Sequence, residues 1–195
     1  MRHRRSQDFR CGCLYFSHRP QYTAPPSRSS KLAIYKDRRY LVHSSTLEIY
    51  DLCTKYDVLL LQEHWLSPNE LDYLDYLNNI HPDFLACGQS AMDISQGIII
   101  GRPYGGTAIL YRKSLSQCIT RVPTNNHRIT AVMLHSLIGP VLIVSVYMPT
   151  DYGDSESKEN YIATCAYISA LYQESNAILM ITAGDFNCQR GSRFY

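Results

Sequence analysis

Three short apolar runs, each followed directly by polar residues, constrain the fold of this sequence more than any other feature. They lie within residues 58–62, 141–147 and 177–182 and are rich in Val, Ile and Leu. Runs of this length and composition are typical of β-strands that are buried on both faces. The chain therefore has to supply a packing layer on each side of these strands.

The segments between these runs predict how the layers are arranged. Residues 107–111 and 128–137 are expected to form further strands, and helices are expected over 46–56, 68–80 and 157–175. The strands between residues 107 and 147 are not separated by helices, which argues against a simple doubly wound sheet. We therefore predict an α/β protein in which two sheets pack face to face, with helices on the outside.

Local patterns predict details of two of these helices. Ser67-Pro68-Asn69-Glu70 has the S-x-x-E form of a capping box, with Pro at the first helical position, where its missing N–H costs nothing. In the helix over 157–175, the spacing of Ile162, Ala166 and Leu171 predicts that these three side chains point inward.

The first forty residues differ in composition from the rest of the chain. Ten Lys/Arg and two Asp/Glu give them a net charge of +8, whereas nine Lys/Arg and fifteen Asp/Glu give residues 41–195 a net charge of −6. We expect residues 1–43 to be a basic, poorly ordered leader and residues 44–195 to form one partial domain. Pro25-Pro26 would break an amphipathic targeting helix, which argues against import into mitochondria.

Composition also excludes several classes of protein. No apolar run approaches the roughly 20 residues that a membrane span requires, and no apolar signal-peptide segment follows the basic N-terminus. The seven cysteines are irregularly spaced, so neither a disulfide framework nor a zinc site is predicted. We expect an intracellular protein, nuclear or cytoplasmic, without a membrane or an obligate protein partner.

Polar side chains stand at the C-terminal ends of the three apolar runs. They are Glu63, Tyr147, and the pair Asp185 and Asn187. Because ligands bind where strand ends meet in α/β proteins, we expect these side chains to converge at one rim. Taken alone, Glu63 also fits a solvated carboxylate, Tyr147 fits half-buried packing, and the G-D-x-N pattern of Asp185 and Asn187 fits an ordinary turn.

Together these side chains have the chemistry for phosphodiester hydrolysis. Carboxylate and amide oxygens are hard ligands that suit Mg²⁺ or Mn²⁺, and such an ion at Glu63 would polarise a phosphoryl oxygen. Asp185 would orient and deprotonate an attacking water. Asn187 and Tyr147 would donate hydrogen bonds to phosphate oxygens as negative charge develops.

The order of the motifs resembles a known family. The matching segments are Leu61-Gln62-Glu63-His64-Trp65-Leu66, Gly105-Gly106-Thr107-Ala108-Ile109, Arg128 in HRITAVML, Ser145-Val146-Tyr147-Met148-Pro149 and Gly184-Asp185-Phe186-Asn187. With these motifs, residues 45–190 resemble the endonuclease/exonuclease/phosphatase family, and most of all the endonuclease domain of non-LTR (LINE-type) retrotransposons. The resemblance implies a four-layer α/β/β/α sandwich and a Mg²⁺-dependent nuclease with DNA as its substrate.

The resemblance also implies roles for individual residues. Glu63 is similar to the metal-binding glutamate of the family, Tyr147 to its phosphate-side tyrosine, Asp185 to its water-orienting aspartate and Asn187 to the adjacent amide. Arg128 resembles a residue near the phosphate-binding face, although an exposed strand arginine explains it equally well. His64, His127 and His135 receive no role.

Two parts of the family pattern are not found in this sequence. The family has an Asn at the end of its first strand, whereas no Asn precedes position 69 here, and the Asp-His pair that follows the family's last strand is also missing. We therefore expect a sandwich that lacks terminal strands, with residues 1–40 in place of the first strand and with impaired catalysis. Two alternatives stay open: a non-catalytic remnant that binds nucleic acid, and a phosphatase or phospholipid phosphodiesterase of the same fold.

Overall fold

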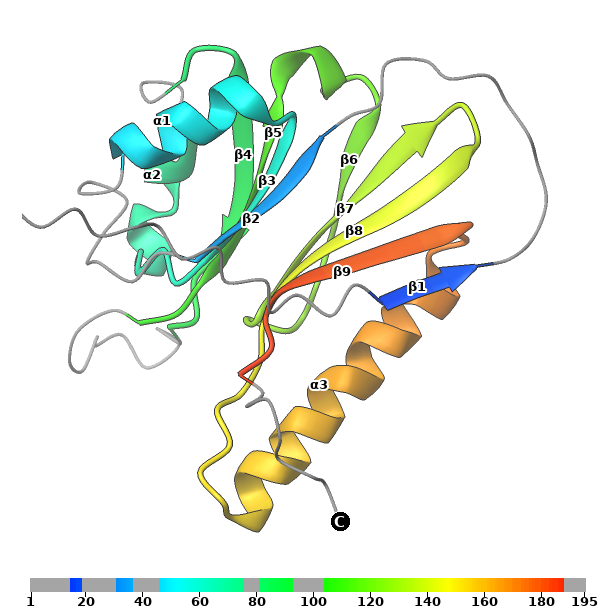
Figure 1. The fold of residues 1–195 in the computed structure, drawn as a ribbon. Helices are drawn as coiled ribbons and strands as arrows, with labels where there is room; N and C mark the ends of the chain where they lie inside the picture. The colour runs from blue at the N-terminus through cyan, green and yellow to red at the C-terminus, as the bar shows by residue number, and fades with distance from the viewer. Residues whose placement is uncertain (1–14, 19–30, 37–45, 76–80, 93–103, 188–195) are drawn as a thin grey trace, which may run out of the picture.

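The computed structural model describes residues 15–18, 31–36, 46–75, 81–92 and 104–187. These residues form two mixed β-sheets that pack face to face (Figure 1), one with the order β1-β9-β8-β7-β6 and the other with the order β2-β3-β5-β4. The strands of the first sheet are β1 (Tyr15–His18), β6 (Ile119–Val122), β7 (Ile129–Ser136), β8 (Gly139–Tyr147) and β9 (Leu179–Asp185). The strands of the second are β2 (Leu32–Lys36), β3 (Val58–Gln62), β4 (Phe84–Gln89) and β5 (Thr107–Arg112).

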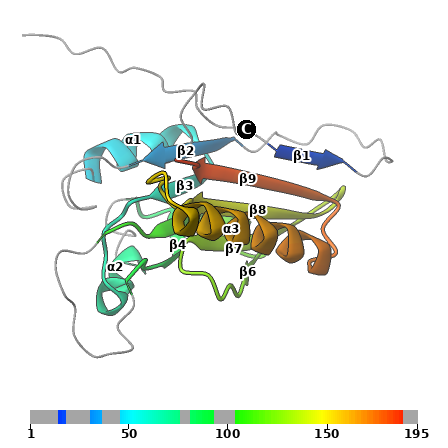
Figure 2. The same cartoon turned by 90° about the horizontal axis from the view of Figure 1, so that it is seen from below.

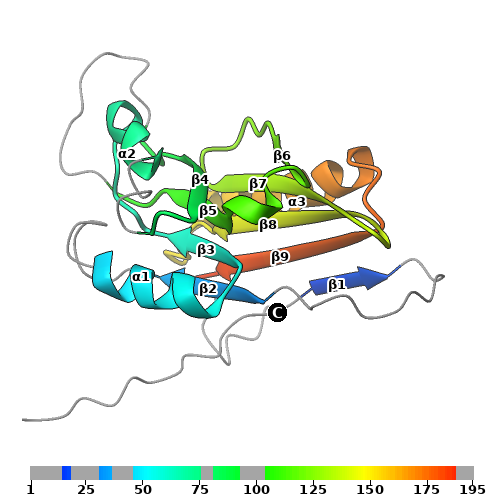
Figure 3. The ribbon, with the colours of Figure 1, turned by 90° about the horizontal axis from the view of Figure 1, so that it is seen from above.

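Helices cover the outer faces of the two sheets. The helical elements are α1 (Thr46–Lys55), α2 (Asp72–Asp75) and α3 (Ser155–Glu174), with 3-10 turns η1 (Pro68–Glu70) and η3 (Lys113–Leu115). α1 and α2 lie outside the four-stranded sheet, and α3 lies along the outer face of the five-stranded sheet (Figures 2 and 3). The predicted four-layer α/β/β/α sandwich is confirmed.

The burial of β3 shows why its sequence is continuously apolar. Val58 and Leu60 belong to the core between the two sheets, whereas Leu59 and Leu61 belong to the core under α1 and α2. Successive side chains of a strand point to opposite faces, and both faces of β3 are covered. β8 divides its side chains in the same way between the inter-sheet core and the core under α3.

Strand directions bring several chain ends to one place. β8 and β9 are parallel and place Tyr147 opposite Asp185. β5 and β7 run antiparallel to β3 and β8, so their N-terminal residues, Thr107 and Ile129, lie at the same end of the sandwich. We call this end the rim. It carries the loop 63–66 after β3, Gly105-Gly106 before β5, and the ends of β8 and β9.

The N-terminal segment differs in part from its prediction. Leu32–Lys36 is a strand that pairs in parallel with β3, and Tyr15–His18 pairs antiparallel with β9. The prediction that residues 1–40 replace the first strand is therefore wrong for residues 32–36. The high basic charge of the segment concealed a short apolar stretch, Leu32-Ala33-Ile34, which has the length and composition of an edge strand. The rest of the predicted leader lies mostly outside the described residues.

The inward face of α3 is also different from the prediction. Ile162 is 61% exposed and Ala166 is exposed, whereas the buried positions are Ser157, Thr164 and Ile168. Leu171 packs against the core under α3, as predicted. Two of the three buried residues carry hydroxyl groups. A prediction from the spacing of apolar residues therefore chose the wrong face of α3.

The predicted capping box begins the turn η1. The Glu70 carboxylate accepts hydrogen bonds from the Ser67 backbone N–H (2.9 Å) and from the Ser67 hydroxyl (2.8 Å). The helix predicted over 68–80 consists of η1 and the single turn α2, and residues 76–80 lie outside the described part. Strands β4 and β6 were not predicted.

Candidate active site at the rim

Glu63 stands in a sharp turn directly after β3. Its φ of 61° is unusual for a residue with a side chain, and its backbone N–H donates to the carbonyl of Gly106 at 2.9 Å. Trp65, at φ 58°, donates in the same way to Gly105 at 3.0 Å. The turn is thus fixed to Gly105-Gly106, and strained backbone of this kind is concentrated at functional sites.

His64 lies beneath this turn and holds it in place. Its side chain is buried; Nδ1 accepts from the backbone N–H of Leu66 (3.0 Å), and Nε2 lies 2.9 Å from the carbonyl of Gln89. Nδ1 is therefore the unprotonated nitrogen, and Nε2–H donates. Burial lowers the pKa of His64 to about 4, although its backbone hydrogen bonds oppose the shift. A Cβ on Gly106 would collide with the His64 ring, so this position requires glycine.

Tyr147 connects the two sheets across the rim. Its hydroxyl is hydrogen-bonded to the carboxylate of Glu63, although Tyr147 ends β8 and Glu63 follows β3. Burial, followed by the negative charges of Glu63 and Asp185, raises the pKa of Tyr147 to about 12, while Arg128 acts in the opposite direction. The phenol is therefore protonated at neutral pH and is able to donate.

Arg128 brings a positive charge to the same place. Its Nη1 donates to the Tyr147 carbonyl at 3.4 Å, and its guanidinium carbon lies 5.8 Å from the centre of the Tyr147 ring. The backbone N–H of Tyr147 donates to the carbonyl of Arg128 at 3.0 Å. Arg128 is partly buried and is attached to the rim through both its backbone and its side chain.

Asp185 and Asn187 form a tight turn at the end of β9. The backbone N–H of Asn187, at φ 46°, donates to Oδ1 of Asp185 at 3.1 Å. Nδ2 of Asn187 donates to the carbonyl of Met148 at 2.6 Å, and the N–H of Met148 donates to the carbonyl of Asp185 at 2.8 Å. One amide proton of Asn187 thus holds this turn against β8.

A buried polar layer lies directly below the rim, between the two sheets. Gln62 Nε2 donates to Ser145 Oγ at 3.0 Å, and the hydroxyls of Thr107 and Thr130 are 2.8 Å apart. All four side chains are buried, and Gln62 pairs with Thr107 and Ser145 with Thr130 in the strand registers. One cross-sheet hydrogen bond therefore joins β3 and β8, the strands that lead to Glu63 and Tyr147, and the other joins their neighbours β5 and β7.

Sequence reasoning did not find this layer. Its trace in the sequence is a Gln, a Ser and two Thr inside otherwise apolar strands. Polar residues in such strands occur at turns, edges and surfaces as well as in cross-sheet bonds. The partner of each polar side chain depends on how the two sheets pack against each other. The sequence alone does not show this packing.

The structure brings together four predicted site residues at the rim, because Glu63, Asp185 and Arg128 all lie close enough to act electrostatically on Tyr147. Asn187 joins them through its bond to Asp185. Among the described residues no group of three His, Cys, Asp or Glu side chains is placed to hold a metal. Glu63 and Asp185 supply two carboxylates beside a protonated phenol, a hard-oxygen set that fits Mg²⁺ or Mn²⁺.

Two packed sheets between helices, with two carboxylates, a phenol and an arginine at one rim, define the class of protein as a four-layer α/β sandwich with polar strand ends. The match to a family model covers residues 38–195 and is more specific. The chain belongs to the Endonuclease/Exonuclease/phosphatase family. Members of this family are typically hydrolases that act on phosphoester bonds.

Solved structures with similar folds support this assignment. The 3′ phosphatase NExo from Neisseria, in a structure with a product DNA hairpin, has a TM-score of 0.56 at 13% identity, over 84% of this chain and 60% of that chain. The endonuclease domain of TRAS1, a telomere-specific non-LTR retrotransposon, has a TM-score of 0.54 at 14% identity, over 83% and 60%. The mannosyl-6-phosphatase Bt3783 from Bacteroides thetaiotaomicron has a TM-score of 0.54 at 16% identity, over 85% and 68%.

These similarities concern the fold. The identities show a shared fold, and the chain spans 60% of the length of the NExo and TRAS1 structures. No curated protein sequence is significantly similar to the chain. No helix in the described residues is long and apolar enough to cross a membrane.

Proposed function

We propose that this chain is a metal-dependent phosphodiesterase that cleaves nucleic acid, of the retrotransposon endonuclease type. The observation that carries the proposal is the meeting of Glu63, Tyr147 and Asp185 at one rim. These residues come from three different strand ends. If they were only solvated surface side chains, their convergence would have no explanation. Such a group matches what the attack of water on a phosphodiester requires.

Each residue has a role that follows from its position. Glu63 would hold a Mg²⁺ or Mn²⁺ ion, which supplies charge neutralisation at a phosphoryl oxygen when bound. Asp185 would accept a proton from the attacking water. The single O–H of Tyr147 would leave Glu63 when substrate binds and donate to a phosphate oxygen, for which its protonated state is suited.

Arg128 and Asn187 would complete the phosphate site. The guanidinium of Arg128 has further N–H groups beside the one that bonds Tyr147, and it would attract a phosphate to the rim. Asn187 would keep Asp185 in position through its bond to Met148, and the second proton of its amide would remain to donate to a phosphate oxygen. This account uses only side chains that are partly exposed at the rim.

DNA is the proposed substrate, because of the motifs in the sequence. The motifs in residues 45–190 resemble those of LINE-type endonuclease domains, and the TRAS1 domain and the DNA-bound NExo share the fold. Phosphatases share it as well, so the choice of nucleic acid rests on the motifs and not on the fold.

Nicking of supercoiled plasmid DNA tests the proposal. The protein is incubated with plasmid and Mg²⁺, and conversion to the open circle is followed with the wild type, Glu63→Gln and Asp185→Asn. Nicking that depends on both carboxylates and on Mg²⁺ is expected. Glu159→Gln changes an exposed acid of α3 and serves as the matched control.

Other substrates in the same assay identify the alternatives. Release of phosphate from a phosphoinositide or from a phosphosugar without DNA nicking would replace the proposal by a phosphatase activity. DNA binding with a steep salt dependence and no turnover in Mg²⁺ or Mn²⁺ would indicate a non-catalytic binding protein.

A further inference from the structure

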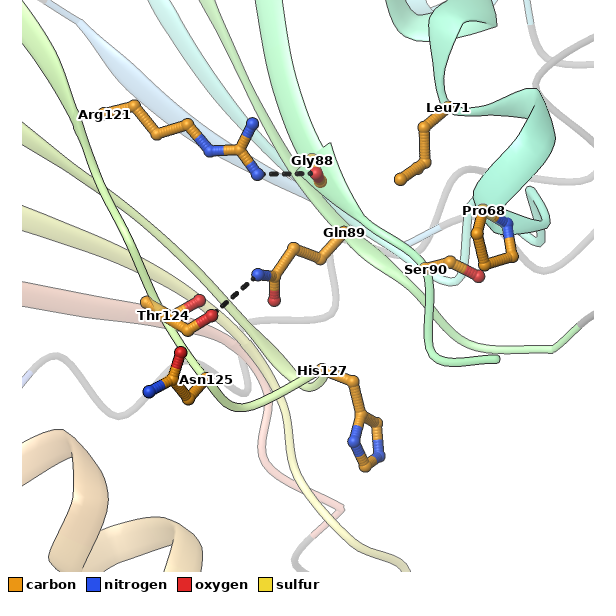
Figure 4. A pocket seen from close by; sticks show the side chains of 9 residues that line it. All are labelled: Pro68, Leu71, Gly88, Gln89, Ser90, Arg121, Thr124, Asn125 and His127. Carbon is orange, nitrogen blue, oxygen red and sulfur yellow. Dashed lines mark hydrogen bonds between the residues drawn. The ribbon is translucent and has the colours of Figure 1, made fainter. Parts of the chain in front are cut away.

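A groove of about 400 Å³ opens beside the candidate active site, between β4 and the loop that connects β6 to β7 (Figure 4). One wall is formed by Pro68 and Leu71, and the opposite wall by Thr124 and Asn125. The remaining lining residues are Gly88, Gln89, Ser90, Arg121 and His127. None of the nine lining residues is acidic, and Arg121 provides a full positive charge.

Strand order places this groove at the same rim as the candidate active site. β4 is two strands away from β3 in the four-stranded sheet, and β6 is two strands away from β8 in the five-stranded sheet. Neighbouring strands are about 4.8 Å apart, so the groove lies roughly 10 Å from Glu63 and Tyr147. This separation is on the scale of adjacent nucleotides in one strand of nucleic acid.

Hydrogen bonds connect the two sides of the groove at Gln89 and connect the groove to the active-site turn. Gln89 Nε2 donates to the carbonyl of Thr124 at 3.0 Å, which joins the end of β4 to the wall formed by Thr124 and Asn125 (Figure 4). The carbonyl of Gln89 accepts from His64, which holds the turn that carries Glu63. A ligand in the groove would therefore meet a preformed surface in a fixed position relative to the site.

Arg121 has further N–H donors besides the one that bonds Gly88. Its Nη2 donates to the carbonyl of Gly88 at 3.3 Å, which directs the guanidinium across the groove. Arg121 forms no ion pair with any carboxylate in the part of the chain that the structure describes. A guanidinium has five N–H donors and matches the geometry of a phosphate.

We propose that this groove binds a nucleotide that flanks the cleaved bond, with its phosphate on Arg121 and its sugar and base against Pro68 and Leu71. The inference rests on the proposed function and extends it. It assigns a second contact to a nucleic-acid strand that runs along the rim from Arg128 toward Arg121. A substrate with a single phosphate group would not reach both arginines.

Salt-dependent binding tests the groove without requiring catalysis. A fluorescein-labelled DNA strand of about twelve nucleotides is titrated with protein in EDTA, and the affinity is measured by anisotropy at several salt concentrations. Arg121→Gln is expected to weaken binding about tenfold at low salt and to reduce the slope of log K against log salt by about 0.7, the value for one phosphate of a single strand. Arg121→Lys should retain the slope.

Lys113→Gln is the matched control, because Lys113 is exposed at the far end of β5 from the rim. If the slope of log K against log salt for Arg121→Gln equals that of the wild type, the groove does not bind a nucleotide through Arg121, and the proposed function stays in place. Equal losses in Arg121→Gln and Arg121→Lys would show that the bond to Gly88, and not the charge, matters, which also overturns it. Failure of the wild type to bind or cleave DNA would remove the proposed function itself.

Discussion

Tyr147 donates a hydrogen bond to Glu63 across the boundary between the two sheets. The two residues are 84 positions apart in the sequence and meet because β3 and β8 pack face to face with their C-terminal ends at the same rim. The site is therefore divided between the sheets, with Glu63 on the four-stranded sheet and Tyr147, Asp185 and Arg128 on the five-stranded sheet. Its geometry depends on how firmly the sheets are held together.

The hydroxyl of Tyr147 is expected to contribute to catalysis and not to folding. Tyr147→Phe removes a donor directed at the site and should lower kcat by about 100-fold, the usual effect of losing one such donor. The pKa of Tyr147 near 12 means that no inflection from this group should occur in the rate profile between about pH 6 and 9. Steady-state kinetics of DNA cleavage checks both statements.

Tyr152→Phe is the control, because Tyr152 is 79% exposed before α3. It should leave kcat and KM unchanged. If Tyr147→Phe also leaves kcat unchanged while the Glu63 and Asp185 variants are inactive, the phenol has no part in the reaction.

The polar layer beneath the rim is expected to behave as a coupled pair of contacts. Thr130→Val leaves the hydroxyl and the carbonyl of Thr107 without their partner and should lower the free energy of unfolding by about 1–3 kcal/mol. The double variant Thr107→Val/Thr130→Val should cost less than the sum of the single changes, because it leaves no orphaned hydroxyl at this contact. Urea denaturation measures all three values.

Thr120→Val tests whether the effect is specific to the layer. Thr120 lies exposed on β6, with a long 3.4 Å contact to His135, and its replacement should change stability by less than about 0.5 kcal/mol. Strict additivity of the Thr107 and Thr130 changes would mean that the cross-sheet bond contributes nothing.

Much of this architecture could be predicted from the sequence, because the apolar runs are local. The strands around Leu60, Ile109 and Ile143 were predicted from composition alone, and the convergence of Glu63 with Tyr147 and Asp185 followed from where those strands end. β2 was missed because the basic residues around Ala33 dominate its segment. The inward face of α3 was misplaced because Ser157 and Thr164 carry no hydrophobic pattern.

The functional details that could not be predicted are those that depend on contacts between sheets. His64 is adjacent to Glu63 in sequence, but its anchor, the carbonyl of Gln89, lies on a strand that no pattern predicted. The groove around Arg121 is formed by the edges of both sheets and has no local motif. Such features require the packing angle and register, which arise from many side chains at once.

His64 is expected to make folding stability dependent on pH. Its pKa is about 4 in the folded state and 6.5 as a free side chain, so between these values the unfolded state binds a proton that the folded state does not. The free energy of unfolding should therefore be unaffected by His64 above about pH 6.5 and should fall as the pH falls toward about 4, by up to about 3 kcal/mol in total. Urea denaturation at about pH 7.5, 6, 5 and 4 measures the slope.

His64→Gln should flatten this part of the profile, at the cost of lower stability at neutral pH. His135→Gln, at an exposed position on β7, should keep the wild-type slope. A profile that is the same for the wild type and His64→Gln would mean that the pKa of His64 does not differ between the folded and unfolded states.

Gly184 is expected to tolerate no side chain, because β8 and β9 approach each other closely there. Its φ is 150°, and a Cβ would collide with the carbonyl of Val146 on β8. Gly184→Ala should therefore separate the strands that carry Tyr147 and Asp185 and lower the free energy of unfolding by more than about 3 kcal/mol, since overpacking adds to backbone strain.

Gly153→Ala is the matched control: φ is 80°, but no atom lies within 4 Å of the added methyl group. It should cost only the strain of its backbone, about 1–2 kcal/mol. Thermal and urea denaturation compare the two, and equal stabilities would show that β9 has room to move away from β8, so that the pairing of Tyr147 with Asp185 is not held by the small size of this glycine.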